Sequence, residues 1–382
     1  MRWRAALRVA ASVIVVTAAL PGQAPSATEI AFAAPDGTPL RGRLVLPAGE
    51  GPHPVIVYAQ AAEGMTIDMR RPLPGGASFS YFDIYRQQLP PLGVGFFSYE
   101  GRGITAADAP PRYERIDSAV YNTSTLSAKA ADLVAAVEAV AGTAGVDPTR
   151  IFAMGASEGT LIATEGAALS GGRVAGLILY GLLALNMRDN FRFILTDGAF
   201  ITYRRFLDTD GDGRVTRAEW DADPRGWRQG NLPGVAWEQL EVNRDGSLTV
   251  EDIATLQRPF LDGLDRGDFA ILDAWSRRFA SVALPAGWWQ DHFAHPTLPT
   301  FLARLDIPIG IFHGEWDNAT PVRAVRELEA RLHREGTHQR IEIHYLDTDH
   351  TLNVGRYFRD GTIPAGHQAI FDYVRRVVAT GR

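Results

Sequence analysis

The chain has 382 residues, of which 46% are hydrophobic and 21% charged, with a net charge of −6 and no cysteine. This length allows one large hydrophobic core with an inserted module, and the interspersed charges without long basic runs argue against nucleic-acid binding. The lack of cysteine excludes a disulfide framework, catalysis by a thiol and a lipid anchor on cysteine.

The first 27 residues have the pattern of a secretory signal peptide. Arg2, Arg4 and Arg8 precede an apolar run at 9–20, and small residues follow at 21–27. Because the apolar run is shorter than a bilayer-spanning helix, we prefer a cleaved signal to the alternative of an N-terminal membrane anchor. We therefore expect a secreted or periplasmic protein with no stable membrane insertion after cleavage.

Residues 28–184 show the alternation of strands and helices of an α/β domain. Residues 29–33 and 40–46 flank a turn and predict a hairpin. The apolar run at 54–58 suits a strand buried on both faces. The order of elements predicts parallel strands joined by right-handed crossovers. Further elements expected here are helices at 81–89, at 127–141 with Ser127 as its cap and at 161–169, and strands at 93–99, 150–154 and 177–180.

Gly155-Ala-Ser157-Glu-Gly159 follows a predicted strand and precedes an Ala-rich helix, and it matches the G-x-S-x-G nucleophile elbow. A serine hydroxyl is a good nucleophile only when a base reaches it, so the chain must lift Ser157 out of the sheet on a sharp turn. The two glycines leave room for that turn. Because the motif is short, the alternative is an ordinary turn from strand to helix.

The pattern changes at residues 185–300, which are helical, aromatic and acidic and which we interpret as an insert. Six of the eight Trp residues lie between Trp220 and Trp289, and we expect them to fill the core of the insert rather than to form an aromatic substrate wall. The α/β pattern resumes at 301–382, where we expect strands at 306–313 and 340–345 and helices at 322–332 and 367–379.

Residues 208–219 of the insert match the loop of an EF-hand. A calcium ion takes about six to eight oxygen ligands, which one short segment supplies only through a tight turn. Gly213 provides that turn. The alternative is a solvated acidic turn. The expected ligands are Asp208, Asp210, Asp212, the carbonyl of Arg214, Thr216 (directly or through water) and Glu219.

Residues 241–252 form a second, weaker match around Gly246. Glu241 and Asp252 replace the usual Asp at the first position and the usual Glu at the last, so we expect weak calcium binding or a preference for Mg²⁺. Val215 and Leu248 occupy the same position in the two loops and should face each other. Helices are expected to flank the loops at 190–207, 235–240 and 250–261. The expected ligands are Glu241, Asn243, Asp245, Ser247, Thr249 and Asp252.

Two residues after later strands complete a catalytic set with the elbow serine. Asp317 follows the strand at 306–313, and His350 lies in the loop after the last predicted strand. The acid and the base thus follow the elbow in the order serine, acid, histidine. The alternatives are a turn-forming role for Asp317 and Glu315 as the acid. Asp347 and Asp349 come too late in the chain to be the acid at a strand end, and we expect them in a solvated loop.

With these residues the chain resembles the α/β-hydrolase superfamily over nearly everything outside the signal and the insert. It is similar to secreted esterase and peptidase-like members, which share its G-x-S-E-G elbow and an acid in H-G-x-x-D. The resemblance implies a mostly parallel sheet flanked by helices. It also implies that Ser157 attacks an acyl carbonyl, that His350 transfers the proton and that Asp317 orients the imidazole.

The resemblance further implies an oxyanion hole and a cap. The oxyanion donors would be the backbone N–H of Glu158 and one N–H from the loop of Gln60 and Ala61, where the superfamily usually has His-Gly or Gly-Gly. A backbone donor needs no particular side chain, and either loop residue is possible. The insert falls where these proteins carry a cap over the active site, and its loops resemble a paired EF-hand domain. The cap is therefore expected to be helical and to bind calcium as a structural ion.

The expected function is a secreted serine hydrolase that cleaves carboxylic esters through an acyl-enzyme. Its partners would be Ca²⁺ and a small-molecule ester or peptide substrate. Since the catalytic set does not distinguish an ester from an amide, a serine peptidase or amidase of the same fold is the first alternative. A calcium-dependent binding protein on a hydrolase scaffold is the second.

Overall fold

The computed structural model describes residues 26–62, 65–73, 76–110, 112–279, 284–337 and 339–379. Of the expected signal peptide, only residues 26 and 27 fall among them. Within the described part of the chain, no helix combines the length and the apolar character that crossing a bilayer requires.

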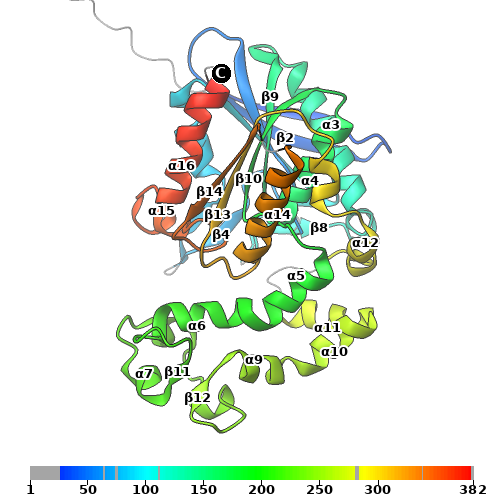
Figure 1. Ribbon diagram of the computed structural model, residues 1–382. Coiled ribbons are helices and arrows are strands. Elements are labelled where there is room, and N and C mark those ends of the chain that lie inside the picture. The colour runs from blue at the N-terminus through cyan, green and yellow to red at the C-terminus, as the bar shows by residue number, and fades with distance from the viewer. Residues whose placement is uncertain are drawn as a thin grey trace, which may run out of the picture.

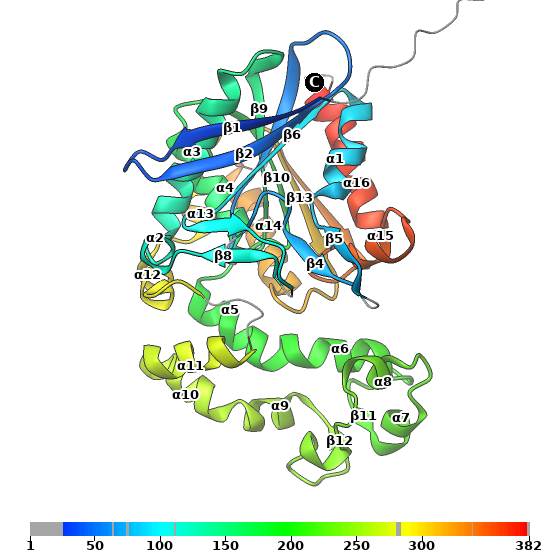
Figure 2. The ribbon, with the colours of Figure 1, turned by 180° about the vertical axis from the view of Figure 1, so that it is seen from behind.

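A mostly parallel sheet forms the centre of the molecule (Figures 1 and 2). Among the described residues it has eight strands, in the order β1-β2-β6-β3-β9-β10-β13-β14. β1 and β2 form the expected antiparallel hairpin and β2 pairs antiparallel with β6, whereas all later neighbours are parallel. The strands are β1 (Ser26–Ala33), β2 (Pro39–Leu46), β3 (His53–Tyr58), β6 (Gly95–Tyr99), β9 (Val146–Ala156), β10 (Val174–Tyr180), β13 (Ile309–Gly314) and β14 (Ile341–Leu346).

Helices cover both faces of the sheet, which explains the continuous apolar runs in the central strands. The two faces are packed by separate clusters of buried side chains, one with α3, α4 and α14 and the other with α1 and α16. These helices are α1 (Asp83–Gln88), α3 (Leu126–Ala141), α4 (Glu158–Leu169), α14 (Val322–Glu335) and α16 (Ala365–Tyr373), which continues as the π-helix η5 (Val374–Ala379).

The N-cap of α3 corrects one expectation. Thr125 has an extended backbone, and its side chain accepts a hydrogen bond from the N–H of Ala128 at 3.2 Å. Ser127, the expected cap, lies inside the helix, because the cap residue must have a non-helical backbone and Thr125 meets that condition two residues earlier.

A helical insert leaves the sheet after β10 and lies across the end of the sheet where the parallel strands finish (Figures 1 and 2). Its outer part, residues 199–256, has its own core of seven buried apolar side chains that include Trp220 and Trp237. We call this part the inserted lobe. The helical elements of the insert up to residue 279 are α5 (Met187–Phe193), the π-helix η3 (Ile194–Gly198), α6 (Ala199–Leu207), α7 (Arg217–Ala222), α8 (Trp227–Asn231), η4 (Trp237–Gln239), α9 (Val250–Leu256), α10 (Arg258–Arg266) and α11 (Phe269–Phe279).

One flanking helix is shorter than expected. The segment 235–240 forms only the 3₁₀ turn η4, because Pro233 and Gly234 precede it and the second loop begins at Glu241. Too few residues remain for an α-helix.

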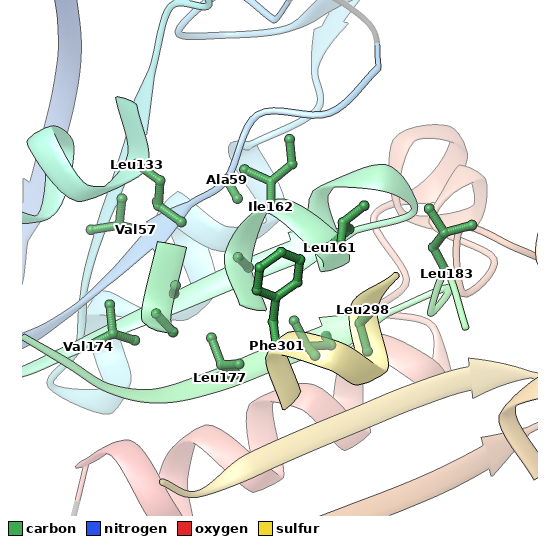
Figure 3. Close-up of a cluster of buried hydrophobic side chains, with 14 of the residues drawn as sticks. Val57, Ala59, Leu133, Leu161, Ile162, Val174, Leu177, Leu183, Leu298 and Phe301 are labelled. Carbon is green, nitrogen blue, oxygen red and sulfur yellow. The ribbon is translucent and has the colours of Figure 1, made fainter. Parts of the chain in front are cut away.

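The end of the insert packs against the sheet rather than within the inserted lobe. α12 (Trp288–Ala294) and α13 (Leu298–Leu302) place Trp288, Trp289 and Phe301 in the main core. In Figure 3, Leu298 and Phe301 lie beside Leu161 and Ile162 of α4. The expected division at residue 300 thus assigns to the insert two helices that pack on the core.

Short elements complete the described chain. Two small hairpins lie near the same end of the sheet as the insert (Figure 2). The short elements are β4 (Arg70–Pro72) paired with β5 (Ser78–Ser80), β7 (Ile104–Ala106) paired with β8 (Glu114–Ile116), η2 (Pro90–Leu92), α2 (Ser118–Tyr121) and α15 (Gly355–Asp360).

Candidate active site

Ser157 lies on a strained turn between β9 and α4. Its φ of 54° and ψ of −126° are unusual for a residue with a side chain, and such strain persists only where the surrounding structure holds it. A Cβ on Gly155 would lie 2.1 Å from the carbonyl oxygen of Gly159. The turn therefore requires the first glycine of the motif, as the sequence predicts, and it exposes Ser157 at the end of the strand.

His350 and Asp317 form a hydrogen-bonded pair at the ends of two neighbouring strands. The Nδ1 of His350 lies 2.9 Å from each carboxylate oxygen of Asp317. Asp317 is buried and also accepts hydrogen bonds from the backbone N–H groups of Ala319 and Thr320, at 2.8 and 2.7 Å. These bonds fix the carboxylate, which in turn fixes the imidazole.

The pair also changes the acidity of both groups. Burial disfavours the charged imidazole, but the charge of Asp317 and its hydrogen bond outweigh burial and raise the pKa of His350 above its ordinary value. Burial would raise the pKa of Asp317, yet the neighbouring His350 lowers it. The carboxylate is thus ionised at neutral pH and can stabilise an imidazolium that forms during a reaction.

His313, for which the sequence predicts no role, supports this arrangement from within the sheet. Its Nδ1 accepts a hydrogen bond from the N–H of Leu182, and its Nε2 donates to the carbonyl of Thr320, both at 3.1 Å. Burial lowers the pKa of His313. A neutral His313 therefore anchors the loop that carries Asp317.

Ser157 and His350 line one cavity of about 210 Å³. Its wall is mostly apolar, and the hydroxyls of Tyr58 and Tyr81 each lie within hydrogen-bond distance of the Tyr180 hydroxyl, at 2.7 and 2.9 Å. Among the residues that the structure describes, no Trp lines this cavity. The lining residues are Tyr58, Ala61, Ala62, Met65, Met69, Tyr81, Ala156, Ser157, Tyr180, His350 and Thr351.

The alternative acids are engaged elsewhere. Glu315 accepts two hydrogen bonds from Arg326. Asp349 accepts hydrogen bonds from Thr351 and Asn353 within its own turn. Asp347 lies exposed in the loop after β14, as expected, and it pairs there with Arg205 of α6 in the insert.

The loop after β3 lies beside the elbow. A Cβ on Gly159 would lie 3.3 Å from the carbonyl oxygen of Ala59. The Gln60 side chain is buried and turns away from the cavity to donate to the carbonyl of Tyr99 at 2.5 Å. Ala61, by contrast, lines the cavity that contains Ser157.

The Glu158 side chain is a feature that sequence reasoning missed. It is buried behind the elbow, within hydrogen-bond distance of Lys129, Trp288 and His292 at 2.7, 2.9 and 3.0 Å. Burial would raise its pKa, but the charges of Lys129 and His292 and the hydrogen bonds to them lower the pKa to about 2. Glu158 is therefore an ionised carboxylate inside the protein.

The first loop of the inserted lobe gathers acidic oxygens. One carboxylate oxygen from each of Asp208, Asp210 and Asp212 lies within 4.8 Å of the others. The last position, Glu219, accepts hydrogen bonds from the N–H groups of Thr209 and Thr216 at 2.7 and 2.9 Å. The turn at Gly213 has a φ of 86°, which favours glycine.

The second loop has the same internal pattern. Asp252 accepts hydrogen bonds from the N–H groups of Val242 and Thr249 at 2.9 and 3.0 Å, which are the positions that Thr209 and Thr216 occupy in the first loop. β11 (Val215–Thr216) and β12 (Ser247–Leu248) pair antiparallel, with Val215 opposite Leu248. The expected contact between the two loops is therefore present.

Comparisons with known proteins identify the fold. No protein-family model matches the sequence, and no curated protein sequence matches it significantly. Among solved structures, the 2,6-dihydroxy-pseudo-oxynicotine hydrolase matches with a TM-score of 0.50 and 14% identity over 94% of this chain and 70% of that one. The α/β hydrolase GrgF from Penicillium sp. sh18 matches with a TM-score of 0.50 and 18% identity over 93% and 99%. DcsB in complex with its substrate analogue matches with a TM-score of 0.50 and 15% identity over 93% and 100%.

At these identities the likeness establishes the fold and no more. The chain has the α/β-hydrolase fold, and the expectation of that fold is confirmed.

Proposed function

We propose that the chain is a serine hydrolase that cleaves carboxylic esters through Ser157, His350 and Asp317. The observation that carries the proposal is the hydrogen bond of His350 to the buried Asp317, together with Ser157 on the wall of the same cavity as His350. The strained backbone of Ser157 supports it, because strain of this kind is concentrated at functional sites.

The proposed reaction has two half-reactions. Ser157 Oγ forms a bond to the acyl carbon while its proton passes to Nε2 of His350, and the carbon–oxygen bond to the leaving alcohol then breaks as His350 protonates that oxygen. Water repeats the sequence on the acyl-enzyme and releases the acid. Asp317 keeps the proton of His350 on Nδ1, so that Nε2 is free to act as the base.

The proposed oxyanion donors are the N–H of Glu158 and one N–H of the loop after β3. The structure favours Ala61 over Gln60, because Ala61 lines the cavity and the Gln60 side chain is turned toward Tyr99. Each donor is expected to lower the barrier by about 3 kcal/mol.

The cavity favours a small, mostly apolar acyl group. Its volume of about 210 Å³ is smaller than the pockets of about 300–1,000 Å³ that hold drug-sized ligands. A peptidase or amidase of the same fold remains the alternative, because the same three residues cleave amides. The second alternative is a calcium-dependent binding protein that does not use the catalytic set.

The inserted lobe is proposed to bind calcium at residues 208–219 through Asp208, Asp210, Asp212, Arg214, Thr216 and Glu219. The convergence of three carboxylates supports this site. The matching hydrogen bonds of Asp252 support a second, weaker site at 241–252, or one that prefers Mg²⁺. Extracellular EF-hand modules bind calcium at about 10⁻⁴–10⁻³ M, a range that suits a structural ion in a secreted protein. Secretion is itself part of the proposal and rests on the pattern of residues 1–27.

The test is hydrolysis of a panel of p-nitrophenyl esters of increasing acyl length and of aminoacyl amides, with calcium and with a chelator. We expect turnover of short esters, abolished in Ser157→Ala and His350→Ala while circular dichroism shows the fold intact. Amide turnover alone would favour the peptidase. Turnover retained in either variant would overturn the triad, and failure of a fluorophosphonate to label Ser157 would favour the binding protein.

A further inference from the structure

The 38 lysine and arginine residues of the chain include a single lysine, Lys129. It is buried on α3, with 6% of its surface exposed, whereas lysine is almost never buried in proteins unless it is paired. At every other position with a Lys or Arg side chain, the chain has arginine, whose cation is a guanidinium; only Lys129 has an ammonium side chain. That position lies directly behind the elbow.

The ammonium of Lys129 joins two segments. Its Nζ donates to the carboxylate of Glu158 at 2.7 Å and to the backbone carbonyl of Ala61 at 2.9 Å. Glu158 is the residue after Ser157, and Ala61 belongs to the loop after β3. These are the two segments from which the oxyanion donors are proposed to come.

An ammonium suits this geometry better than a guanidinium. Its three donors spread in three directions from one atom, so one charge can bond a carboxylate and a carbonyl that lie on different segments. A guanidinium is larger and planar, and it favours two parallel bonds to one carboxylate. Arginine would therefore pair with Glu158 but would not fit the same space or hold the Ala61 carbonyl in the same place.

The carboxylate oxygen of Glu158 that does not bond Lys129 is held as well. Trp288 and His292 of α12 bond the other carboxylate oxygen, and Asp291 of α12 accepts a hydrogen bond from the N–H of Leu126 at the start of α3, at 2.6 Å. The carboxylate is thus fixed from two sides and is a rigid link between Lys129 and the first turn of α4.

We infer that Lys129 is a positioning residue that sets the two oxyanion donors at their working separation, by binding the Glu158 carboxylate and the Ala61 carbonyl at once. The inference rests on the proposed serine hydrolase. It adds that the geometry of the oxyanion hole depends on this ammonium, which itself does not touch the substrate.

The experiment measures the second-order rate constant for labelling of Ser157 by a fluorophosphonate, which needs no knowledge of the natural substrate. It compares the full-length wild type with Lys129→Met, Lys129→Arg and the double variant Lys129→Met/Glu158→Gln, and each melting temperature is recorded. For any ester that is turned over, kcat and KM are measured separately. We expect Lys129→Met and Lys129→Arg to label about 10- to 100-fold more slowly, with the loss in kcat and KM changed less than about threefold.

The double variant separates positioning from stability. Lys129→Met leaves the Glu158 carboxylate buried without its ammonium partner, which destabilises the protein, whereas the double variant removes the carboxylate together with the ammonium and should recover much of the melting temperature. We expect labelling of Ser157 in the double variant to remain slow, because no ammonium holds the Ala61 carbonyl. The double variant also gives the answer if Lys129→Met does not fold.

A matched control uses the same helix. Glu165 of α4 lies 2.9 Å from Nε2 of His295, which follows α12, so this pair also joins α4 to the segment after the inserted lobe but does not reach the loop of Ala61. Glu165→Gln should lower the melting temperature without slowing the labelling.

The outcomes distinguish the two proposals. A wild type that is not labelled at Ser157 would overturn the serine hydrolase and this inference with it. A labelled wild type with Lys129→Met within twofold of its rate would overturn the inference alone. So would a double variant that regains the wild-type rate together with its melting temperature, because the ion pair would then be structural only.

Discussion

Nη2 of Arg205 donates to both carboxylate oxygens of Asp347, 2.8 Å from each. Arg205 lies in the last turn of α6, three residues before the first proposed calcium loop, and Asp347 begins the loop that carries His350. The next residue of α6, Phe206, packs edge-on against Trp316, which neighbours Asp317. The helix that leads into the proposed calcium site therefore contacts both loops that supply the proposed catalytic acid and base.

The first prediction concerns this contact. Arg205→Met should lower kcat/KM by about fivefold at most, because an exposed ion pair contributes about 1 kcal/mol or less. It should also reduce the factor by which a chelator lowers the activity, since one link between the calcium loop and the His350 loop is removed. Ester kinetics of both proteins with calcium and with chelator provide the measurement.

The control for this prediction is Arg323→Met. Arg323 is an exposed arginine of α14, outside the inserted lobe, that pairs with Glu327, so its loss should leave the effect of the chelator unchanged. If Arg205→Met keeps the full calcium dependence of the wild type, the coupling does not run through this ion pair.

The second prediction concerns the first proposed calcium loop, residues 208–219. Asp210 and Asp212 accept hydrogen bonds from the N–H groups of Asp212 and Arg214, and an asparagine oxygen can accept the same bonds. Asp210→Asn/Asp212→Asn should therefore weaken calcium binding by at least about tenfold without lowering the melting temperature measured in chelator. Isothermal titration and thermal unfolding with and without calcium test it.

In the wild type, chelation should lower the melting temperature and the activity together. Asp221→Asn, which removes a charge from the same lobe outside the loops, should leave the calcium affinity nearly unchanged. Lost activity with unchanged melting would instead favour a calcium-gated lid, and unaltered binding in the double variant would contradict the site.

The third prediction is the pH dependence of hydrolysis. The base must be neutral, so kcat/KM should rise with pH and reach half its maximum above 6.5, because Asp317 raises the pKa of His350 from that ordinary value. In Asp317→Asn the carboxylate is gone, so burial should lower the apparent pKa relative to the wild type. The rate should also fall by about 10³- to 10⁴-fold. Profiles of kcat/KM against pH for the wild type and Asp317→Asn measure both effects. If the midpoint of the variant's profile equals that of the wild type, Asp317 does not set the pKa of His350.

The fourth prediction concerns the elbow. Gly155→Ala should destabilise the protein by about 3 kcal/mol or more, because its Cβ would lie 2.1 Å from a backbone oxygen that cannot move aside. Gly142→Ala is the matched control, since the atoms nearest to its Cβ are 3.8 Å away and its φ is −80°. Urea unfolding of the two variants compares them. Equal stability would contradict the tight turn.

The local structures that the sequence predicts and the structure contains share one property. The hairpin, the strained turn at Ser157 and the paired acidic loops of the insert are each specified by a few consecutive residues, so the sequence pattern contains them. Asp317 and His350 are predicted from their positions directly after strands, which is also a local pattern. The hydrogen bond between them agrees with that prediction.

The features that were missed join residues far apart in the chain. Arg205 and Asp347 are 142 positions apart, and Lys129 is 29 positions from Glu158. Neither pair has a local pattern, because a charged side chain on a helix is usually solvated and its partner depends on tertiary packing. Thr125 was missed as a cap for a different reason, since helix ends are decided by small differences between neighbouring polar residues.

A protease that cleaves after lysine has a single site in this chain, the bond between Lys129 and Ala130. Both residues are buried in α3 behind the elbow, so the bond can be cut only when that part of the core opens. If the opened segment recloses faster than the protease cleaves it, the cleavage rate measures the equilibrium for local opening of α3 around Lys129. The composition of the chain thus supplies a natural proteolytic probe for the local stability of the elbow, with no engineered site.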